Sequence, residues 1–369
     1  MLTLTVELNG IILQQDESSC QDPNVAMIRA RKGPPTITDI ARRLGTSAMT
    51  VSRALTGKPE VSEEMRQKVT ECAKMLGYQP NRFARSLVTQ RSNMVGVVIP
   101  EIAHLFFADV ISGIEEVLDE ANYDILLCHS RGDPERERAE IRTLIGSHID
   151  GLIVAPVQPL KSPELFLDLQ NQQVPFVLFD RFFPGYDFPS VRLDDVAAGR
   201  SAAEFLVQLG HERIAHIAGP SVSPAKLRRQ GFVSALRKAH VPISSDWIVR
   251  ASFDMEGGRH ATETLLSRAL VPTAIFAAND PLALGAVYAC REAGLRIPQD
   301  ISVMGVGNIE GPCHPNPFLT TIDWPRQELG RKAASFLLDA LSSQGKHPSS
   351  TFVFQPQVLA RHSTASVAM

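Results

Sequence analysis

Residues 36–57 read TITDIARRLGTSAMTVSRALTG, and this stretch decides the fold of the amino-terminal part of the chain. Its apolar side chains recur three and four residues apart, on one face of a helix: Ile37, Ile40, Ala41 and Leu44. Thr36 and Asp39 form a capping-box pattern before this helix, and Gly45 suits the left-handed conformation that ends a helix. Ser47 is placed to cap a second helix over residues 48–55. The pattern therefore predicts two short helices joined by a tight turn.

A third helix is expected between a cap at Ser62 and the closing Gly77. Two helices joined by a turn and supported by a third form a helix-turn-helix, whose second helix fits the major groove of DNA. The side chains expected on the outer face of that second helix are small or able to hydrogen-bond, apart from one methionine: Ala48, Met49, Thr50, Ser52 and Arg53. Any three-helix bundle would show similar caps, so the charge of the segment is needed as further evidence.

Charge is unevenly distributed along the chain. Residues 27–91 contain 13 lysines and arginines against 5 acids, whereas residues 1–26 contain 4 acids and no base. Residues 92–369 have 24 bases against 31 acids, so a basic segment is joined to an acidic body. Charge alone fits a polyanion-binding module and a solvated basic surface equally well. Together with the polar second helix, it favours DNA binding.

Several consecutive motifs in this region resemble the start of the LacI/GalR family of bacterial transcription regulators. The match to T-x-x-D-I/V-A-x-x-x-G-x-S-x-x-T-V-S-R-x-L-N-G is nearly complete, with Thr56 where Asn is usual, and it continues through L-G-Y-x-P-N and A-R-S-L. By this resemblance the base-reading positions are Ala48, Met49 and Arg53, of which the arginine offers a bidentate fork suited to guanine. The positions expected to contact phosphates are Thr36, Ser47, Thr50 and Ser52.

The resemblance also implies a hinge helix and linker in residues 81–92, which becomes helical when two copies lie together in the minor groove. Its expected DNA contacts are Asn81, Ala84, Arg85 and Leu87. Leu87 takes the position of a leucine that enters a base step as an apolar wedge and kinks the duplex. From the residues alone, Leu87 would be one apolar side chain in a polar segment.

After the linker, short apolar runs alternate with amphipathic helical stretches. Seven runs have the length and composition of buried parallel strands: MVGVVI, DILLCH, GLIVA, FVLFD, RIAHIA, TAIFAA and ISVMGV. Their number is too large for one small sheet, so two α/β lobes are expected. Blocks such as GHERIAHIAG and FAANDPLALGA extend the family resemblance over this body. The predicted fold class is α+β multidomain: an all-α helix-turn-helix head with a hinge helix, followed by a two-lobed, periplasmic-binding-protein-like α/β body with parallel sheets.

The predicted domain boundaries place an extension at residues 1–35, the helix-turn-helix domain at 36–80, the hinge at 81–92 and an effector-binding and dimerisation domain at 93–369. Residues 1–26 have no counterpart in the family. We expect either that translation starts at Met27 or that the segment is a disordered acidic extension. The alternating stretch LTLTVEL leaves an added strand as the alternative.

Ligands of two-lobed α/β folds bind at the carboxyl ends of the strands, in the cleft between the lobes. Pocket positions implied by the resemblance are Phe106, Phe107, Asp180, Arg228, Phe253, Asn279 and Trp324. Aromatic faces would stack on a ring, while an arginine and an amide would hold polar groups. Taken singly, each residue could equally be a core or surface residue. Gly307 stands where sugar- and purine-responsive members commonly carry an aspartate, so the pocket lacks one carboxylate. The effector is therefore expected to be anionic or less hydroxylated: a sugar or, in particular, a sugar acid held by Arg228.

The sequence contains no G-x-x-x-x-G-K-S/T, H-E-x-x-H or G-x-S-x-G, so it lacks the signatures of three large enzyme classes. Five scattered cysteines without a C-x-x-C pair argue against a cysteine-built zinc site, and no catalytic residue, metal or cofactor is predicted. No apolar run approaches the roughly 18 residues of a membrane span, and no basic start precedes an apolar stretch as in a signal peptide. A secreted solute-binding protein is therefore the weaker alternative to a cytoplasmic regulator.

The sequence predicts a homodimeric transcription regulator without enzymatic activity. It is expected to act as a repressor, to bind a near-palindromic operator in double-stranded DNA, and to respond to a small-molecule effector.

Overall fold

The structure is a computed structural model that describes residues 34–79, 91–102, 105–158, 163–309, 317–343 and 351–367. The chain divides into two compact units, residues 1–88 and residues 89–369, here called the head and the body.

The described part of the head is a bundle of three helices, α2 (Ile37–Leu44), α3 (Ala48–Leu55) and α4 (Glu63–Leu76). Each begins and ends where the sequence predicted. At the start of α3, Ser47 Oγ accepts a hydrogen bond of 3.0 Å from the Thr50 N–H. Gly45 ends α2 in the left-handed conformation, with a φ of 62°. The apolar faces of the three helices meet in a small core that includes Ile40, Val51, Val69 and Cys72.

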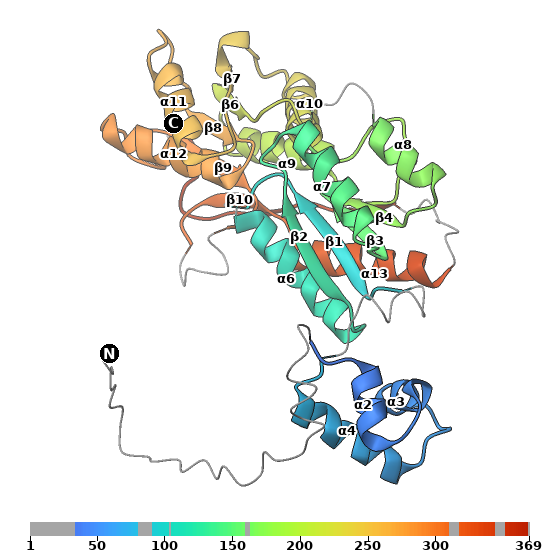
Figure 1. The fold of residues 1–369 in the computed structure, drawn as a ribbon. Coiled ribbons are helices and arrows are strands. Elements are labelled where there is room, and N and C mark those ends of the chain that lie inside the picture. The colour runs from blue at the N-terminus through green and yellow to red at the C-terminus, as the bar shows by residue number, and fades with distance from the viewer. Residues whose placement is uncertain are drawn as a thin grey trace, which may run out of the picture. The chain divides into compact units, whose positions relative to one another are not determined.

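The first lobe of the body is a six-stranded parallel sheet in the order β11-β5-β4-β3-β1-β2 (Figure 1). Its strands are β1 (Met94–Ile99), β2 (Asp124–His129), β3 (Gly151–Val154), β4 (Phe176–Phe179), β5 (Ser190–Leu193) and β11 (Thr351–Phe354). Its helices are α6 (Leu105–Glu120), α7 (Pro134–Gly146), α8 (Glu164–Asn171) and α13 (Arg326–Ser342). Alternate strand residues face opposite layers: Val97 packs in the core that contains α6 and α13, and Val98 in the core that contains α7 and α8.

The second lobe is a six-stranded sheet in the order β12-β10-β9-β8-β6-β7. Its strands are β6 (Ile214–Ala218), β7 (Ile248–Arg250), β8 (Ala274–Ala277), β9 (Ser302–Val306), β10 (Thr320–Asp323) and β12 (Gln357–Leu359). Its helices are α9 (Asp195–Gln208), α10 (Ser223–Lys238), α11 (Met255–Leu266) and α12 (Asp280–Glu292), with the short 3-10 helix η2 (Ser245–Trp247) before β7. The predicted two-lobed body with parallel sheets is confirmed, with β12 as one antiparallel edge strand. This strand follows β11 of the first lobe directly, without a crossover helix.

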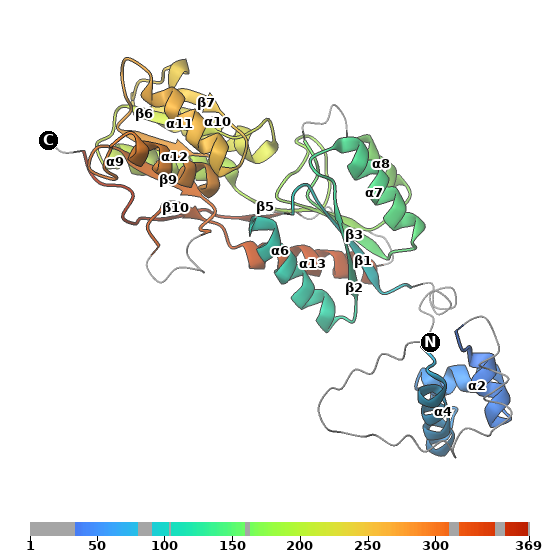
Figure 2. The same ribbon diagram turned by 60° about the vertical axis from the view of Figure 1, so that its left-hand side comes forward.

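The chain crosses between the lobes three times, from β5 to α9, from β10 to α13 and from β11 to β12 (Figure 2). The second crossing is held against the first lobe by the close packing of α6 and α13. A Cβ on Gly113 of α6 would overlap the carbonyl oxygen of Gln327 in α13, so only glycine permits this approach. The crossing residue Trp324 thereby lies beside the amino-terminal turn of α6, which positions one wall of the candidate site.

Candidate functional site

The DNA-binding surface predicted on the head is built on α3. Val51 and Ala54 face the core of the head, whereas Ser52 and Arg53 are exposed and 63% of the surface of Met49 is exposed. An apolar tip and a guanidinium therefore project from one face of the helix. Two of the predicted contacts, Ala48 and Thr50, are only half-exposed, and Ala48 packs partly against the core of the head.

Thr36 lies at the start of α2, where its hydroxyl is already engaged within the head. Its N–H and its hydroxyl both donate to Asp39 Oδ2, at 2.9 and 2.7 Å. Asp39 Oδ1 in turn pairs with Arg42 at 3.2 Å. A phosphate contact through the Thr36 hydroxyl would require it to leave Asp39. The predicted hinge contacts lie outside the described residues: Asn81, Ala84, Arg85 and Leu87.

All seven residues predicted to form a ligand pocket line one cavity of about 690 Å³ in the body, here called the interlobe cavity: Phe106, Phe107, Asp180, Arg228, Phe253, Asn279 and Trp324. They come from both lobes and from the crossing between β10 and α13. This volume lies within the range of roughly 300–1,000 Å³ typical of small-molecule sites. The structure thus brings together residues that are up to 218 positions apart in the sequence.

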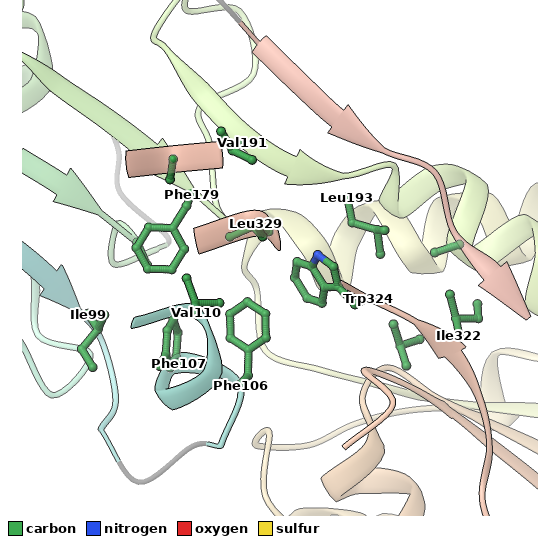
Figure 3. Packing of buried hydrophobic residues seen from close by; sticks show 14 of the residues in the cluster. Ile99, Phe106, Phe107, Val110, Phe179, Val191, Leu193, Ile322, Trp324 and Leu329 are labelled. Atoms are coloured by element: carbon green, nitrogen blue, oxygen red, sulfur yellow. The ribbon is translucent and has the colours of Figure 1, made fainter. Parts of the chain in front are cut away.

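The aromatic residues form a wall in which the rings pack on one another (Figure 3). The ring centroids of Phe106 and Trp324 lie 4.5 Å apart with an interplanar angle of 34°, and Phe107 meets Phe106 edge to face at 5.0 Å. All three side chains are almost completely buried. They therefore form an apolar wall of the interlobe cavity.

Arg228, on the second turn of α10, supplies the most buried charge of the cavity. Its Nε donates to Asp195 Oδ1 at 2.8 Å and its Nη1 to the Ala278 carbonyl oxygen at 2.6 Å. Its Cζ lies 5.1 Å from the centre of the Trp324 ring. Its Nη2 has no hydrogen-bond partner among the described residues. A buried donor left without an acceptor is costly, so a ligand that supplies an acceptor here gains affinity.

Asp180 follows β4 directly and adopts a left-handed backbone conformation, with a φ of 61°. Only 7% of its surface is exposed, and its nearest cation is Arg181, whose Nε lies 3.6 Å from Oδ2. Burial raises the pKa of the Asp180 carboxyl to about 6, although Arg181 opposes this shift. Asp180 thus provides an acceptor whose ionisation changes close to neutral pH.

Asn279 and Phe253 form one structural unit at the edge of the cavity. Asn279 caps α12, because its Oδ1 accepts from the Leu282 N–H at 3.0 Å. Its Nδ2 donates to the Phe253 carbonyl oxygen at 3.2 Å and so fixes the loop after β7. Since both ends of the amide are engaged, the structure favours a positioning role for Asn279 over the predicted direct hold on a ligand.

Comparison with known proteins supports the architecture described above. Residues 92–357 match the family of periplasmic binding proteins and sugar binding domains of the LacI family, and residues 36–81 match the bacterial regulatory proteins of the lacI family. The transcriptional repressor CytR of Escherichia coli is 34% identical over 314 residues, which cover 85% of this chain and 91% of CytR. The chain belongs to the LacI family.

Further relatives cover about nine-tenths of this chain. The transcriptional regulator DegA of Bacillus subtilis is 34% identical over 333 residues, which cover 89% of this chain and 98% of DegA. The crystal structure of the lac repressor dimer bound to operator and the anti-inducer ONPF matches with a TM-score of 0.81 at 29% identity, over 90% of this chain and all of that chain. As a member of the LacI family, the protein is a DNA-binding transcription regulator and not an enzyme.

In this LacI-family chain, Gly307 follows β9 directly and lines the cavity with a φ of 134°, a conformation that favours glycine. Its carbonyl oxygen accepts from Arg326 Nη1 at 2.8 Å. The Arg326 Nε pairs with Asp109 Oδ2 of α6 at 2.9 Å, so this arginine links the second lobe to the first. At position 307 the chain therefore presents a backbone carbonyl oxygen, bound by Arg326, and lacks the carboxylate common in sugar- and purine-responsive members.

The sequence did not identify several polar residues that line the same cavity: Glu101, Arg181, Asp254 and Arg326. Arg181 is adjacent to the predicted Asp180, and Arg326 follows the predicted Trp324 by two positions. Their closeness in sequence to predicted residues could have identified these two arginines. Asp195 was also missed as the partner of Arg228, because its role depends on the packing of α9 against α10.

Within the described ranges, no group of three or more histidine, cysteine, aspartate or glutamate residues could hold a metal ion. No described helix has the length and apolar character needed to cross a membrane.

Proposed function

We propose that this chain is a homodimeric, cytoplasmic repressor whose paired heads bind a near-palindromic operator, and that a sugar in the interlobe cavity controls operator affinity. The lac repressor dimer on its operator supports this proposal for the DNA, because the full length of that chain is matched. The exposed Met49 and Arg53 of α3 are then the side chains placed to contact base edges in the major groove.

The effector proposal rests on one observation: a buried hydrogen-bond donor and a buried hydrogen-bond acceptor line the same apolar cavity. Arg228 Nη2 has no partner among the described residues, and the Asp180 carboxylate is met only by Arg181 at 3.6 Å. A hydroxyl group can accept a hydrogen bond from the former and donate one to the latter. A ring with several hydroxyls therefore suits this cavity.

A neutral sugar fits the charges of the cavity better than a sugar acid does. Each cavity arginine already faces a carboxylate: Arg228 faces Asp195 at 2.8 Å, Arg326 faces Asp109 at 2.9 Å and Arg181 faces Asp180. An added anion would therefore meet no uncompensated charge. The structures of two similar regulators contain neutral sugars, CelR in complex with cellobiose (30% identical, TM-score 0.67) and a LacI-family regulator of Enterococcus faecium with bound ribose (31% identical, TM-score 0.66).

Control of DNA binding requires only that the sugar prefer one arrangement of the lobes. A preference of about 1–3 kcal/mol changes operator affinity roughly 5- to 150-fold, and operator binding changes sugar affinity by the same factor. The Arg326 contacts to Asp109 and Gly307 join the lobes beside the cavity, so a ligand there acts directly on the link between them.

Tryptophan fluorescence offers a direct test, because the chain has only two tryptophans, Trp247 and Trp324. The variant Trp247→Phe leaves Trp324 as the sole reporter inside the cavity. We expect ribose, glucose or cellobiose to change its emission saturably, and gluconate to bind at least tenfold more weakly. A gel-shift titration with a symmetric operator, with and without the active sugar, then measures the coupling. Tightest binding of the acid, or no response to any sugar, would overturn the proposed effector class.

A further inference from the structure

A second cavity, of about 260 Å³, lies in the second lobe at the carboxyl ends of β6 and β7, beside α10. It is here called the β6–α10 pocket, and the residues that matter for its chemistry are Gly219, Ser221, Lys226, Arg229, Val233 and Arg250. Ligands of parallel α/β sheets bind at the carboxyl ends of strands, and this pocket occupies such a place at the edge of the sheet. None of its residues was predicted from the sequence, and none takes part in the function proposed above.

The pocket is cationic and contains no carboxylate among the residues that line it. Lys226 and Arg229 lie three positions apart on one face of α10, and Arg250 ends β7. Within the described part of the chain, no carboxylate lies at salt-bridge distance from any of the three. This contrasts with the interlobe cavity, where Arg228 and Arg326 each pair with an aspartate. Three like charges gathered in one concave site favour an anion as occupant.

One of the three cations is held in place by a neutral group. Arg250 Nη1 donates to Ser221 Oγ at 2.7 Å, which orients the guanidinium while its other N–H groups stay available. The loop that carries Ser221 follows β6, so the hydroxyl, the guanidinium and the two α10 side chains approach the pocket from three different elements.

We propose that the β6–α10 pocket binds the phosphoryl group of a small phosphorylated metabolite. A phosphate monoester is a near-dianion at neutral pH with three acceptor oxygens, which suits a site lined by three cations from two elements, α10 and the end of β7. The volume is several times the roughly 30 Å³ that one water occupies in the liquid. Val233 and Ala225 add apolar surface, so the pocket has room for the organic part of the ligand as well.

The two cavities share a wall, which gives the second ligand a route to regulation. Arg228 lines the interlobe cavity and the adjacent Arg229 lines the β6–α10 pocket. Gly219 lines the β6–α10 pocket and lies so close to Phe253 of the interlobe cavity that a Cβ would overlap the ring. A ligand that shifts the Gly219 loop therefore shifts Phe253. This coupling rests on the proposed function, whereas the phosphoryl site does not.

Isothermal titration of the full chain with glycerol 3-phosphate tests the site, with glycerol as the ligand control. The double variant Lys226→Gln/Arg229→Gln removes two of the three cations. Its matched control, Arg237→Gln/Lys238→Gln, removes two exposed cations from the other end of the same helix. We expect saturable binding to the wild type and the control, and at least a tenfold loss in the pocket variant. Since the cationic head is unchanged in both variants, binding there cannot produce this difference.

The proposal is overturned if glycerol 3-phosphate does not bind saturably, or if both double variants lose affinity equally. Arg250→Gln supplies a second, exposed substitution that must also weaken binding. The fluorescence of Trp324 in the Trp247→Phe variant then distinguishes the proposed sugar effector from the proposed phosphoryl site. Intact phosphate binding without any sugar response would overturn the proposed effector, while a sugar response without saturable phosphate binding would overturn only the β6–α10 site. Binding of both ligands with no mutual effect would reject the coupling alone.

Discussion

Arg228 and Asp195 form an ion pair at 2.8 Å in which each residue has only 2% of its surface exposed. The pair exists because α9 and α10 approach closely at two glycines. A Cβ on Gly199 would overlap the Arg228 carbonyl oxygen, and one on Gly231 would overlap the Val196 carbonyl oxygen. The close packing of these helices therefore places a counter-charge beside Arg228 of the interlobe cavity.

The variant Asp195→Asn should strongly destabilise the body. It leaves the buried Arg228 guanidinium without a counter-charge, and breaking one side of a buried pair costs about 3–5 kcal/mol. Urea unfolding followed by circular dichroism measures this loss. Glu256→Gln is the matched control, because Glu256 pairs with Arg259 on the exposed surface of α11, where little change is expected. Equal effects of the two substitutions would contradict a special role for the buried pair.

The variant Asp180→Asn should stabilise the protein at neutral pH while it weakens sugar binding. Burial raises the pKa of Asp180 to about 6 in the folded chain, against about 3.9 in an unfolded chain. The folded state therefore binds the proton more tightly, and this residue lowers stability as pH rises from about 4 to about 6. We expect the variant to gain about 1–3 kcal/mol at pH 7 and almost nothing at pH 4. A gain that is equal at both pH values would contradict the assignment.

The three described helices of the head could be predicted almost completely because their signals are local. The caps at Ser47 and Ser62 and the glycines at 45 and 77 lie within a few residues of the helices that they bound. The seven cavity residues came from the family resemblance. By contrast, β5 and β10 are four-residue strands that include polar side chains such as Arg192 and Thr320, so no apolar run marked them. The Asp195 partner of Arg228 could not be predicted either, because it lies 33 positions away and depends on helix packing.

The variant Arg53→Ala should weaken operator binding and relax its base preference. Arg53 is exposed on α3, and a bidentate arginine contact to a base is worth about 1–3 kcal/mol of discrimination. Fluorescence anisotropy with the symmetric operator and with a randomised duplex measures both affinities. Lys74→Gln in α4 removes the same charge from the head without touching α3. We expect the operator-to-random ratio to fall in Arg53→Ala and to stay unchanged in the control; an unchanged ratio in both would place base recognition elsewhere.

Substitutions at Gly307 test how much the glycine-specific backbone conformation beside the cavity matters for stability. A Cβ at this position would meet nothing closer than Asp280 Oδ2 at 3.6 Å, so a clash is not expected. The φ of 134° is nevertheless unfavourable for any residue with a side chain, at a cost of roughly 1–3 kcal/mol. Gly307→Ala should therefore destabilise the chain by about that amount, and Gly307→Asp should carry the same cost although it adds the carboxylate expected from the resemblance.

The control for this substitution is Gly146→Ala, which should have the opposite sign. Gly146 is exposed at the end of α7 with an ordinary helical backbone, and nothing lies within 4 Å of its Cβ position. There alanine lowers the entropy of the unfolded chain without strain and should stabilise by about 0.4–1 kcal/mol. Urea unfolding of both variants gives the comparison. If Gly307→Ala also stabilises the chain, the loop after β9 has an ordinary backbone conformation at position 307. The hydrogen bond from Arg326 to the carbonyl oxygen of residue 307 would then not require glycine.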